Sequence, residues 1–167
     1  MQRIAIDPGM SGAIAWDTGT LPVQVANMPS TLRDILDLLE GIAGGRELDT
    51  RIVIEKVGWY MPGNSGPAAV KFARHCGALE MALISLRVPF DQVLPSKWEH
   101  LVIGKPAYAK IPPEIKGNAR KKILSDRKRD RKNRIKARMQ EVYPHLKVTL
   151  VNADALAMLY FMTQTNC

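Results

Sequence analysis

Three stretches of the sequence, far apart along the chain, each place one carboxylate beside a run of apolar residues. Asp7 follows Ile4-Ala5-Ile6, Glu55 follows Ile52-Val53-Ile54, and Asp154 stands at the start of a long apolar segment. The first two runs have the composition of buried strands, and the third segment that of a buried helix. A charge beside such runs is unfavourable unless it is compensated. A fold that gathers the three acids around a shared divalent cation would compensate all of them.

The three acids suit metal-dependent chemistry on phosphodiesters. In a two-metal site, ions about 4 Å apart activate a water and stabilise the leaving oxygen. We therefore predict Asp7, Glu55 and Asp154 as catalytic metal ligands for a pair of Mg²⁺ or Mn²⁺ ions, with no organic cofactor. Each acid alone has a simpler explanation. Asp7 could belong to a plain Pro-Gly turn, Glu55 could be a solvated strand end, and Asp154 could complement a helix dipole.

Length and composition indicate one soluble-type domain. The chain has 167 residues, of which 46% are hydrophobic, which is enough for a single domain over residues 1–167 with a full core. No apolar run approaches the roughly 20 residues of a membrane span, and the N-terminus lacks the pattern of a secretory signal. The cysteines form no disulfide framework and no zinc spacing. We expect a cytoplasmic protein without a membrane partner.

The net charge of +8 is concentrated in one segment. Residues 120–138 hold eleven Lys or Arg and two Asp, whereas the rest of the chain holds thirteen basic and fourteen acidic residues. Such a segment on a near-neutral protein is typical of phosphate-backbone binding, although charge runs also occur on solvated helices and disordered arms. We predict a basic DNA-binding helix or arm over about 119–142, with contacts from Arg120, Lys121, Lys122, Arg127, Lys128, Arg131, Lys132 and Arg134.

Hydrophobic spacing and turn residues predict an α/β fold. Strands are expected at 3–7, 13–16, 22–27, 51–55 and 88–94, and helices at 31–42, 67–86, 95–102, 119–142 and 153–164. Ser30 is the expected N-cap of the first helix. Residues 104–118 look like a mobile loop, and 148–151 like a short extended stretch. An opening meander followed by helices and further strands predicts a mixed sheet with helices on both faces.

Four motifs occur in order along the chain. They are Ile4-Ala5-Ile6-Asp7-Pro8-Gly9, Glu55 at its strand end, Val93-Leu94-Pro95-Ser96-Lys97-Trp98 and Asp154-Ala155-Leu156-Ala157. Together they resemble the RuvC-type Holliday-junction resolvases, most of all the compact phage and prophage members. The resemblance implies an RNase H-like fold, with a five-stranded mixed sheet whose first three strands are antiparallel. It also implies a homodimeric crossover junction endodeoxyribonuclease that nicks four-way or other branched DNA in recombination and repair.

The chain departs from this family pattern beside Asp154. Many RuvC-type enzymes carry a fourth acid three residues before the last Asp, and here that residue is Val151, followed by Asn152. A three-carboxylate site completed by water and substrate is one explanation. Alternatively, Asn152 stands in the place of an Asp metal ligand and the chain is a variant of reduced activity. The third explanation, which we favour, is that Asn152 is only a helix N-cap.

Residues outside the basic segment are further candidates for DNA contact. Lys97, beside the buried-type Trp98, could meet a phosphate or be only a surface residue, and Lys105 is a weaker candidate. Trp59 and Tyr60 lie in a loop rich in Gly and Pro. There an aromatic ring could stack in an opened junction, for about 1–3 kcal/mol per base, or fold back onto the core. Trp98 itself is expected in the core.

The same sequence leaves other functions open. A non-catalytic branched-DNA-binding protein of the same fold would account for the missing fourth acid. The stretch Asp7-Pro8-Gly9-Met10-Ser11-Gly12 is also similar to the first phosphate loop of RNase H-like ATPases and sugar kinases, which are usually much longer because a second lobe closes over the nucleotide. For a homodimer, the small residues of the 67–86 helix offer an interface, although they could equally pack that helix on its own sheet.

Overall fold

The computed structural model describes residues 1–45, 49–58, 66–105 and 107–165. Its elements are β1 (Gln2–Asp7), β2 (Ala13–Asp17), β3 (Gln24–Asn27), α1 (Leu32–Ala43), β4 (Thr50–Glu55), α2 (Gly66–Ser85), β5 (Phe90–Val93), α3 (Pro95–Ile103), α4 (Gly117–Val142) and α5 (Ala153–Thr165). The strands form one open sheet in the order β3-β2-β1-β4-β5. β1, β2 and β3 are antiparallel neighbours, and β4 and β5 extend the sheet parallel to β1. The predicted mixed sheet with three antiparallel first strands is confirmed.

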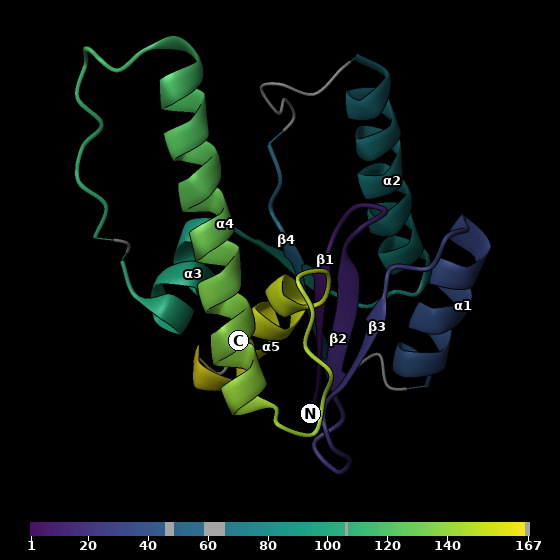
Figure 1. Cartoon of the computed structure of the whole chain (residues 1–167). Coiled ribbons are helices and arrows are strands. Elements are labelled where there is room, and N and C mark those ends of the chain that lie inside the picture. The colour runs from purple at the N-terminus through teal and green to yellow at the C-terminus, as the bar shows by residue number, and fades with distance from the viewer. Residues whose placement is uncertain (46–48, 59–65, 106, 166–167) are drawn as a thin grey trace.

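Alternating side chains on the strands divide the core between the two faces of the sheet. Ile4 and Ile54 point to the face covered by α1 and α2. Ala5 and Val53, one residue away on the same strands, point to the face covered by α3, α4 and α5. This alternation is the period of two that an extended backbone imposes. Figure 1 shows the two groups of helices on opposite sides of the sheet.

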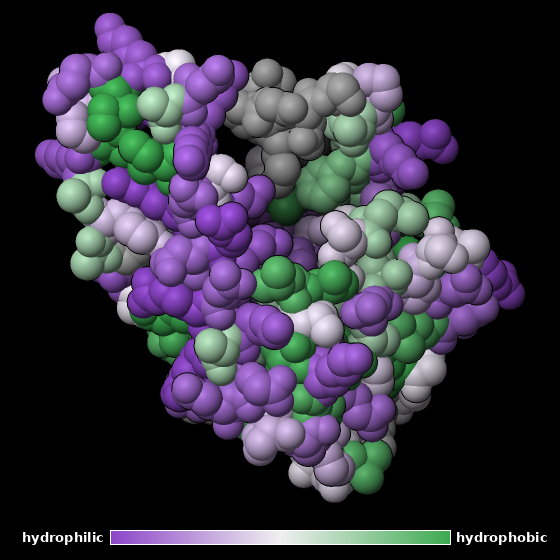
Figure 2. Space-filling model, in the orientation of Figure 1, coloured by the Kyte–Doolittle hydropathy of each residue, from purple (hydrophilic) through white to green (hydrophobic). Residues whose placement is uncertain are grey.

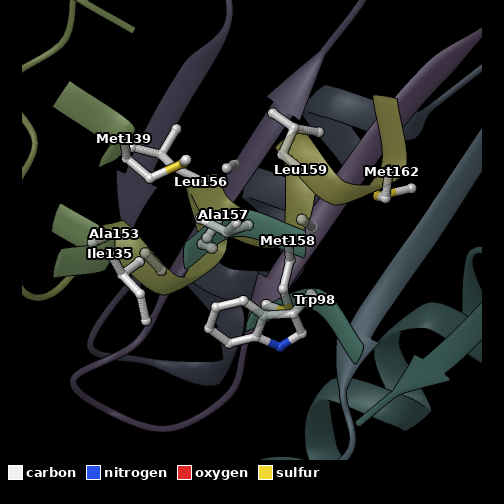
Figure 3. Close-up of a cluster of buried hydrophobic side chains, with 14 of the residues drawn as sticks. Trp98, Ile135, Met139, Ala153, Leu156, Ala157, Met158, Leu159 and Met162 are labelled. Carbon is white, nitrogen blue, oxygen red and sulfur yellow. The ribbon is translucent and has the colours of Figure 1, made fainter. Parts of the chain in front are cut away.

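Helix α5 lies at the centre of the second layer. The sheet residues beneath it include Ala5, Ala13 and Ala15, whose small side chains let the helix lie close to β1 and β2. Its other sides are covered by α3 and α4, so side chains all around α5 are buried. Figure 3 shows them packed with Trp98 of α3 and Ile135 of α4. Trp98 is 1% exposed, which confirms the prediction that it belongs to the core.

Two predicted details near helix starts were wrong. The N-cap of α1 is Thr31 instead of Ser30, because Thr31 Oγ1 accepts the N–H of Asp34 at 3.1 Å. Both residues carry a hydroxyl, and only the backbone path decides which one faces the first turn of the helix. Residues 148–151, expected to be extended, form no strand and end in the turn that leads into α5.

The segment between α3 and α4, predicted as a mobile loop, is attached to α4 by side-chain contacts. The Tyr108 hydroxyl donates to Asp130 Oδ2 at 2.5 Å. Arg127 Nη2 donates to the carbonyl of Ala109 at 2.6 Å, and its guanidinium lies over the Tyr108 ring. Figure 1 shows this segment running beside the end of α4 that extends beyond the sheet. The basic segment is thus a regular helix, and no described helix has the length and apolar character to cross a membrane.

Candidate active site

The ends of two neighbouring strands position the first two acids. β1 and β4 run parallel with Ile6 opposite Ile54, and Asp7 and Glu55 come one residue later on each strand. Both acids therefore lie at the carboxyl edge of the sheet on adjacent strands. Asp7 lies two residues after Ala5, and Glu55 two residues after Val53, and both of these strand residues pack on the face covered by α5. Because strand side chains alternate between the two faces, the side chains of both acids project toward that helix.

Asp154 reaches the same edge from the first turn of α5. The helix packs across β1, and the Asp154 side chain is 13% exposed. A carboxylate at this position also complements the positive end of the helix dipole. The charge of Asp154 raises the pKa of both Asp7 and Glu55. The structure therefore brings the three predicted acids, which are far apart in sequence, into one electrostatic environment.

Burial is the main cause of the unusual pKa values at this edge. It raises the pKa of Asp7 from 3.8 to about 8, with further increases from the charges of Glu55 and Asp154. Burial likewise raises the pKa of Glu55 from 4.5 to about 7. The pKa of Asp154 is raised by burial and lowered by neighbouring basic side chains. Carboxylates whose charged forms are disfavoured by burial and mutual repulsion are the groups that a bound cation would stabilise.

A fourth acid, Glu99 on α3, was not predicted. Its charge raises the pKa of Glu55, and the charge of Asp154 in turn raises the pKa of Glu99, for which burial is the larger cause. Glu99 accepts a 2.5 Å hydrogen bond from Arg131 Nη1 on α4, and its side chain is 15% exposed. In the sequence, Glu99 is indicated as a site residue by its position directly after Trp98, which is buried. That signal is weak, because the direction of Glu99 depends on how α3 packs against α4 and α5.

Basic residues on one face of α4 lie close to the acids. Lys128, Arg131 and Lys132 recur at the spacing of one helical turn, and all three lower the pKa of Asp154. Lys132 Nζ lies 3.7 Å from Asp154 Oδ2, and its charge also lowers the pKa of Asp7. Part of the segment predicted to bind DNA is therefore directed into the acidic site.

The donor set fits a divalent cation, although the side chains are not gathered as a finished site. Among the described residues, no three or more His, Cys, Asp or Glu side chains form a group placed to hold a metal ion. Burial and mutual repulsion raise the pKa of Asp7 and Glu55, and a nearby positive charge would offset both effects. Trp98 Nε1 is a buried donor without a hydrogen-bond partner in the described structure. It lies close enough to Glu55 to lower the pKa of that carboxyl.

The Asn152 side chain is directed backward along the chain. Its Oδ1 accepts the N–H of Thr149 at 2.7 Å, and its Nδ2 donates to the carbonyl of Lys147 at 3.2 Å. Asn152 does stand at the N-cap position, since its carbonyl accepts the N–H of Leu156 at 3.1 Å, but within the described residues its carboxamide makes no hydrogen bond to the N–H groups of α5, so the expected side-chain cap is not formed. Asn152 is 6% exposed and stabilises the turn that precedes Asp154.

Two glycines hold the turn that follows Asp7. A Cβ on Gly12 would lie 2.0 Å from the Asp7 carbonyl oxygen, and the Gly12 N–H donates to the carbonyl of Gly9 at 3.0 Å. Gly9 has a φ of +112°, and a Cβ there would meet the Phe72 ring at 3.0 Å. Only glycine fits these two positions without a shift of neighbouring atoms. The turn is therefore shaped by its packing against Asp7 and α2.

The other predicted DNA contacts fall into four groups. Lys97 and Lys105 are exposed at the start of α3 and just after its end. Arg134 donates to the carbonyl of Ile103 at 2.7 Å, and so, like Arg127, fastens the α3–α4 segment. Trp59 and Tyr60 lie outside the described residues. The remaining predicted contacts on α4 are exposed, namely Arg120, Lys121, Lys122 and Lys128.

The sheet order and the acids at the ends of β1, β4 and the start of α5 define a protein of the RNase H-like fold. Two similar solved structures are both of RuvC from Thermus thermophilus. One is 15% identical with a TM-score of 0.56, covering 99% of this chain and 97% of that chain. The other, RuvC in complex with Holliday junction substrate, is 14% identical with a TM-score of 0.55, covering 99% and 96%.

At these identities the likeness establishes the fold, and it spans nearly the full length of both chains. The RuvC fold implied by the four sequence motifs is confirmed. No family model matches the chain, and no curated protein sequence does.

Proposed function

We propose that the protein is a divalent-metal-dependent endonuclease that nicks branched DNA, and four-way junctions in particular. The observation that carries this proposal is the convergence of Asp7, Glu55 and Asp154 beside the basic face of α4. Its support is the RuvC fold, since one of the similar structures holds a Holliday junction. The basic residues near the site would bring the phosphate backbone to the carboxylates.

Each acid has a distinct part in the proposed chemistry. Asp7, at the end of the central strand β1, would be the principal metal ligand, with Glu55 from the neighbouring strand and Asp154 from α5 beside it. A bound Mg²⁺ or Mn²⁺ would supply an activated water and charge stabilisation at phosphorus. Burial of the acids strengthens every charge interaction with a phosphate. Asn152, engaged with the preceding turn, supports Asp154 and need not ligate the metal.

The proposed DNA path follows the basic side of the molecule. Figure 2 shows hydrophilic side chains gathered over α4, beside a hollow in this face. Phosphate contacts would come from the solvent-facing cations of α4 and from Lys97 and Lys105 at the two ends of α3. Arg127 and Arg134 would contribute indirectly, because they fix the segment that lies along α4. Such contacts predict strongly salt-dependent binding.

We also propose a homodimer formed through α2, because symmetric incision of a four-way junction needs two active sites. Helix α2 exposes an apolar stripe of Val70, Gly77, Met81 and Ile84, at spacings that place them on one face. Val70, Met81 and Ile84 are 57–60% exposed. A Cβ on Gly77 would meet no atom within 4 Å, so a second helix can approach closely there. The face toward the sheet is formed by other residues of α2.

A cleavage assay tests the proposal. Purified protein is incubated with a labelled four-way junction and a matched linear duplex, with and without Mg²⁺ or Mn²⁺. We expect metal-dependent paired nicks on the junction. Asp7→Asn should bind the junction and leave it intact, whereas Asp91→Asn, on the exposed edge strand β5, should cut normally.

Two further outcomes separate the alternatives. Cleavage only after Asn152→Asp would identify the chain as an inactivated variant. Junction binding without cleavage by either protein would favour a branched-DNA-binding protein of the same fold. Equal affinity for junction and duplex would overturn the proposed specificity.

A further inference from the structure

Two basic residues of α4 meet the acidic site in different ways. Arg131 makes its short contact with Glu99, whose Oε1 lies 2.5 Å from Arg131 Nη1, and its charge also lowers the pKa of Glu55 and Asp154. Lys132 stands 3.7 Å from Asp154 Oδ2, beyond the usual length of a hydrogen bond between charged groups. Its charge acts on Asp7 as well as on Asp154. The Lys132 ammonium therefore forms a loose ion pair with Asp154 and also acts on Asp7, so that it stands near two of the proposed metal ligands.

One divalent cation balances the net charge of the site when all of its carboxylates are ionised. The carboxylates that influence one another are Asp7, Glu55, Glu99 and Asp154. When all are ionised they carry four negative charges, of which Arg131 and Lys132 balance two. The remaining two match a single Mg²⁺ or Mn²⁺. Lys128 acts only on Asp154 and is exposed, where water screens its charge.

The number of carboxylates available as metal ligands also indicates a single divalent cation. The last helix brings one acid to the site, because the residue one turn before Asp154 is Val151 and the Asn152 side chain is held by the preceding turn. Glu99 is occupied by Arg131. A pair of ions sharing a bridging carboxylate would need further anionic ligands on the side of Asp154. That side is occupied by an ammonium group.

We propose that the Lys132 ammonium takes the place of a second metal ion, so that each protomer binds one divalent cation. This inference rests on the proposed nuclease function. Lys132 projects from α4 one turn before Ile135, which is fully buried, so the stem of its side chain starts from a fixed backbone. The side chain is 37% exposed and can reach a phosphate oxygen while remaining close to Asp154. A lysine ammonium offers three donors and a compact positive charge for such a phosphate.

Metal stoichiometry tests this directly and without any cleavage. Mn²⁺ is titrated into the full-length protein, and binding is followed by calorimetry and by the loss of the free-ion paramagnetic resonance signal. We expect one ion per protomer for the natural chain. Lys132→Glu, which replaces the ammonium with a carboxylate, should bind a second ion. Lys136→Glu, one turn further along α4 and exposed, changes the net charge equally and should still bind one.

A natural chain that binds two ions, or a folded Lys132→Glu protein that binds only one, would overturn the inference. In both cases the nuclease proposal could still stand, because junction cleavage is measured separately. One bound ion without any junction cleavage would defeat the nuclease proposal and leave the stoichiometry intact. No bound ion in any variant would defeat both.

Catalysis provides a second measurement. Lys132→Met should lower the nicking rate by about 100-fold or more, the size expected when a charge that stabilises the transition state is removed. Lys132→Arg, which keeps the charge, should recover part of that loss. The rate should depend on Mg²⁺ concentration with a Hill coefficient near one, as expected for a single ion. A coefficient near two, or a normal rate for Lys132→Met, would contradict the proposed role.

Discussion

Glu99 of α3 and Arg131 of α4 form a partly buried ion pair, 2.5 Å between Oε1 and Nη1, at the border of the acidic site. The pair joins two helices that both pack on α5. It also limits the repulsion that Glu99 exerts on Glu55, because Arg131 lowers the pKa of both acids. The pair therefore keeps a fourth carboxylate beside the proposed metal ligands, and Arg131 offsets part of the rise that Glu99 causes in the pKa of Glu55.

Removing one partner of this pair should destabilise the protein more than removing both. Arg131→Ala leaves Glu99 charged and mostly buried, and should lower the free energy of unfolding by about 1–3 kcal/mol. Adding Glu99→Gln should recover much of that loss. The measurement is urea unfolding, with Arg138→Ala as control, since the Arg138–Glu141 pair is exposed and water screens its charges. A double variant as unstable as Arg131→Ala would contradict the repulsion argument.

Without metal, stability should fall as the pH rises from about 4 to 8. The pKa of Asp7 is about 8 in the folded protein against an ordinary 3.8, so in this range the folded state keeps a proton that the unfolded state releases. Glu55 adds to the effect up to about pH 7. Asp7→Asn should remove most of the dependence and stabilise the metal-free protein at pH 8 by about 1–3 kcal/mol.

The check is thermal unfolding in EDTA at pH 5 and pH 8, with Asp91→Asn as a matched exposed control. Mg²⁺ should raise the melting temperature of the natural chain at pH 8 and have little effect on Asp7→Asn, because a ligand that binds only the folded state stabilises it. If the natural chain and Asp7→Asn lose stability equally between pH 5 and pH 8, Asp7 is not the group responsible.

Local pattern was sufficient to predict the sheet and where the three acids lie on their own elements. The apolar runs that end at Asp7 and Glu55 fix both the strand bounds and the face on which the acids emerge, because strand side chains alternate strictly. The position of Asp154 at the start of an apolar helix followed in the same way. These features depend on the residues within one element.

Glu99 and the division of the basic helix could not be predicted from local pattern. α4 has almost no separation of polar and apolar faces, apart from Ile135 and Met139, so its sequence does not indicate which lysines face the acids. That choice depends on how α3 and α4 pack against α5. The direction of the Asn152 side chain could not be predicted from local pattern either, since an Asn before a helix can form hydrogen bonds forward to the helix or backward to the preceding turn.

Gly12 should be required for the geometry of Asp7. In Gly12→Ala the new methyl group would lie 2.0 Å from the Asp7 carbonyl oxygen, so the β1–β2 turn must shift. We expect a loss of about 3 kcal/mol or more in the free energy of unfolding, together with weaker Mn²⁺ binding. Gly41→Ala in α1 is the control, because a Cβ there meets nothing within 4 Å and should stabilise the helix slightly. Normal stability and Mn²⁺ affinity in Gly12→Ala would refute this requirement.

The proposed dimer should depend on the exposed stripe of α2. Met81→Glu places a charge in the middle of that stripe, opposite the same residue or its neighbours in a two-fold symmetric interface. Burying an unpaired charge there is unfavourable, so the variant should be monomeric in sedimentation and light-scattering measurements at concentrations where the natural chain is a dimer. Leu150→Glu is the control, because Leu150 is a similarly exposed apolar residue remote from α2 in sequence. On a junction, the monomeric variant should make single nicks without pairing them. A natural chain that stays monomeric, or a Met81→Glu protein that stays dimeric, would exclude α2 as the interface.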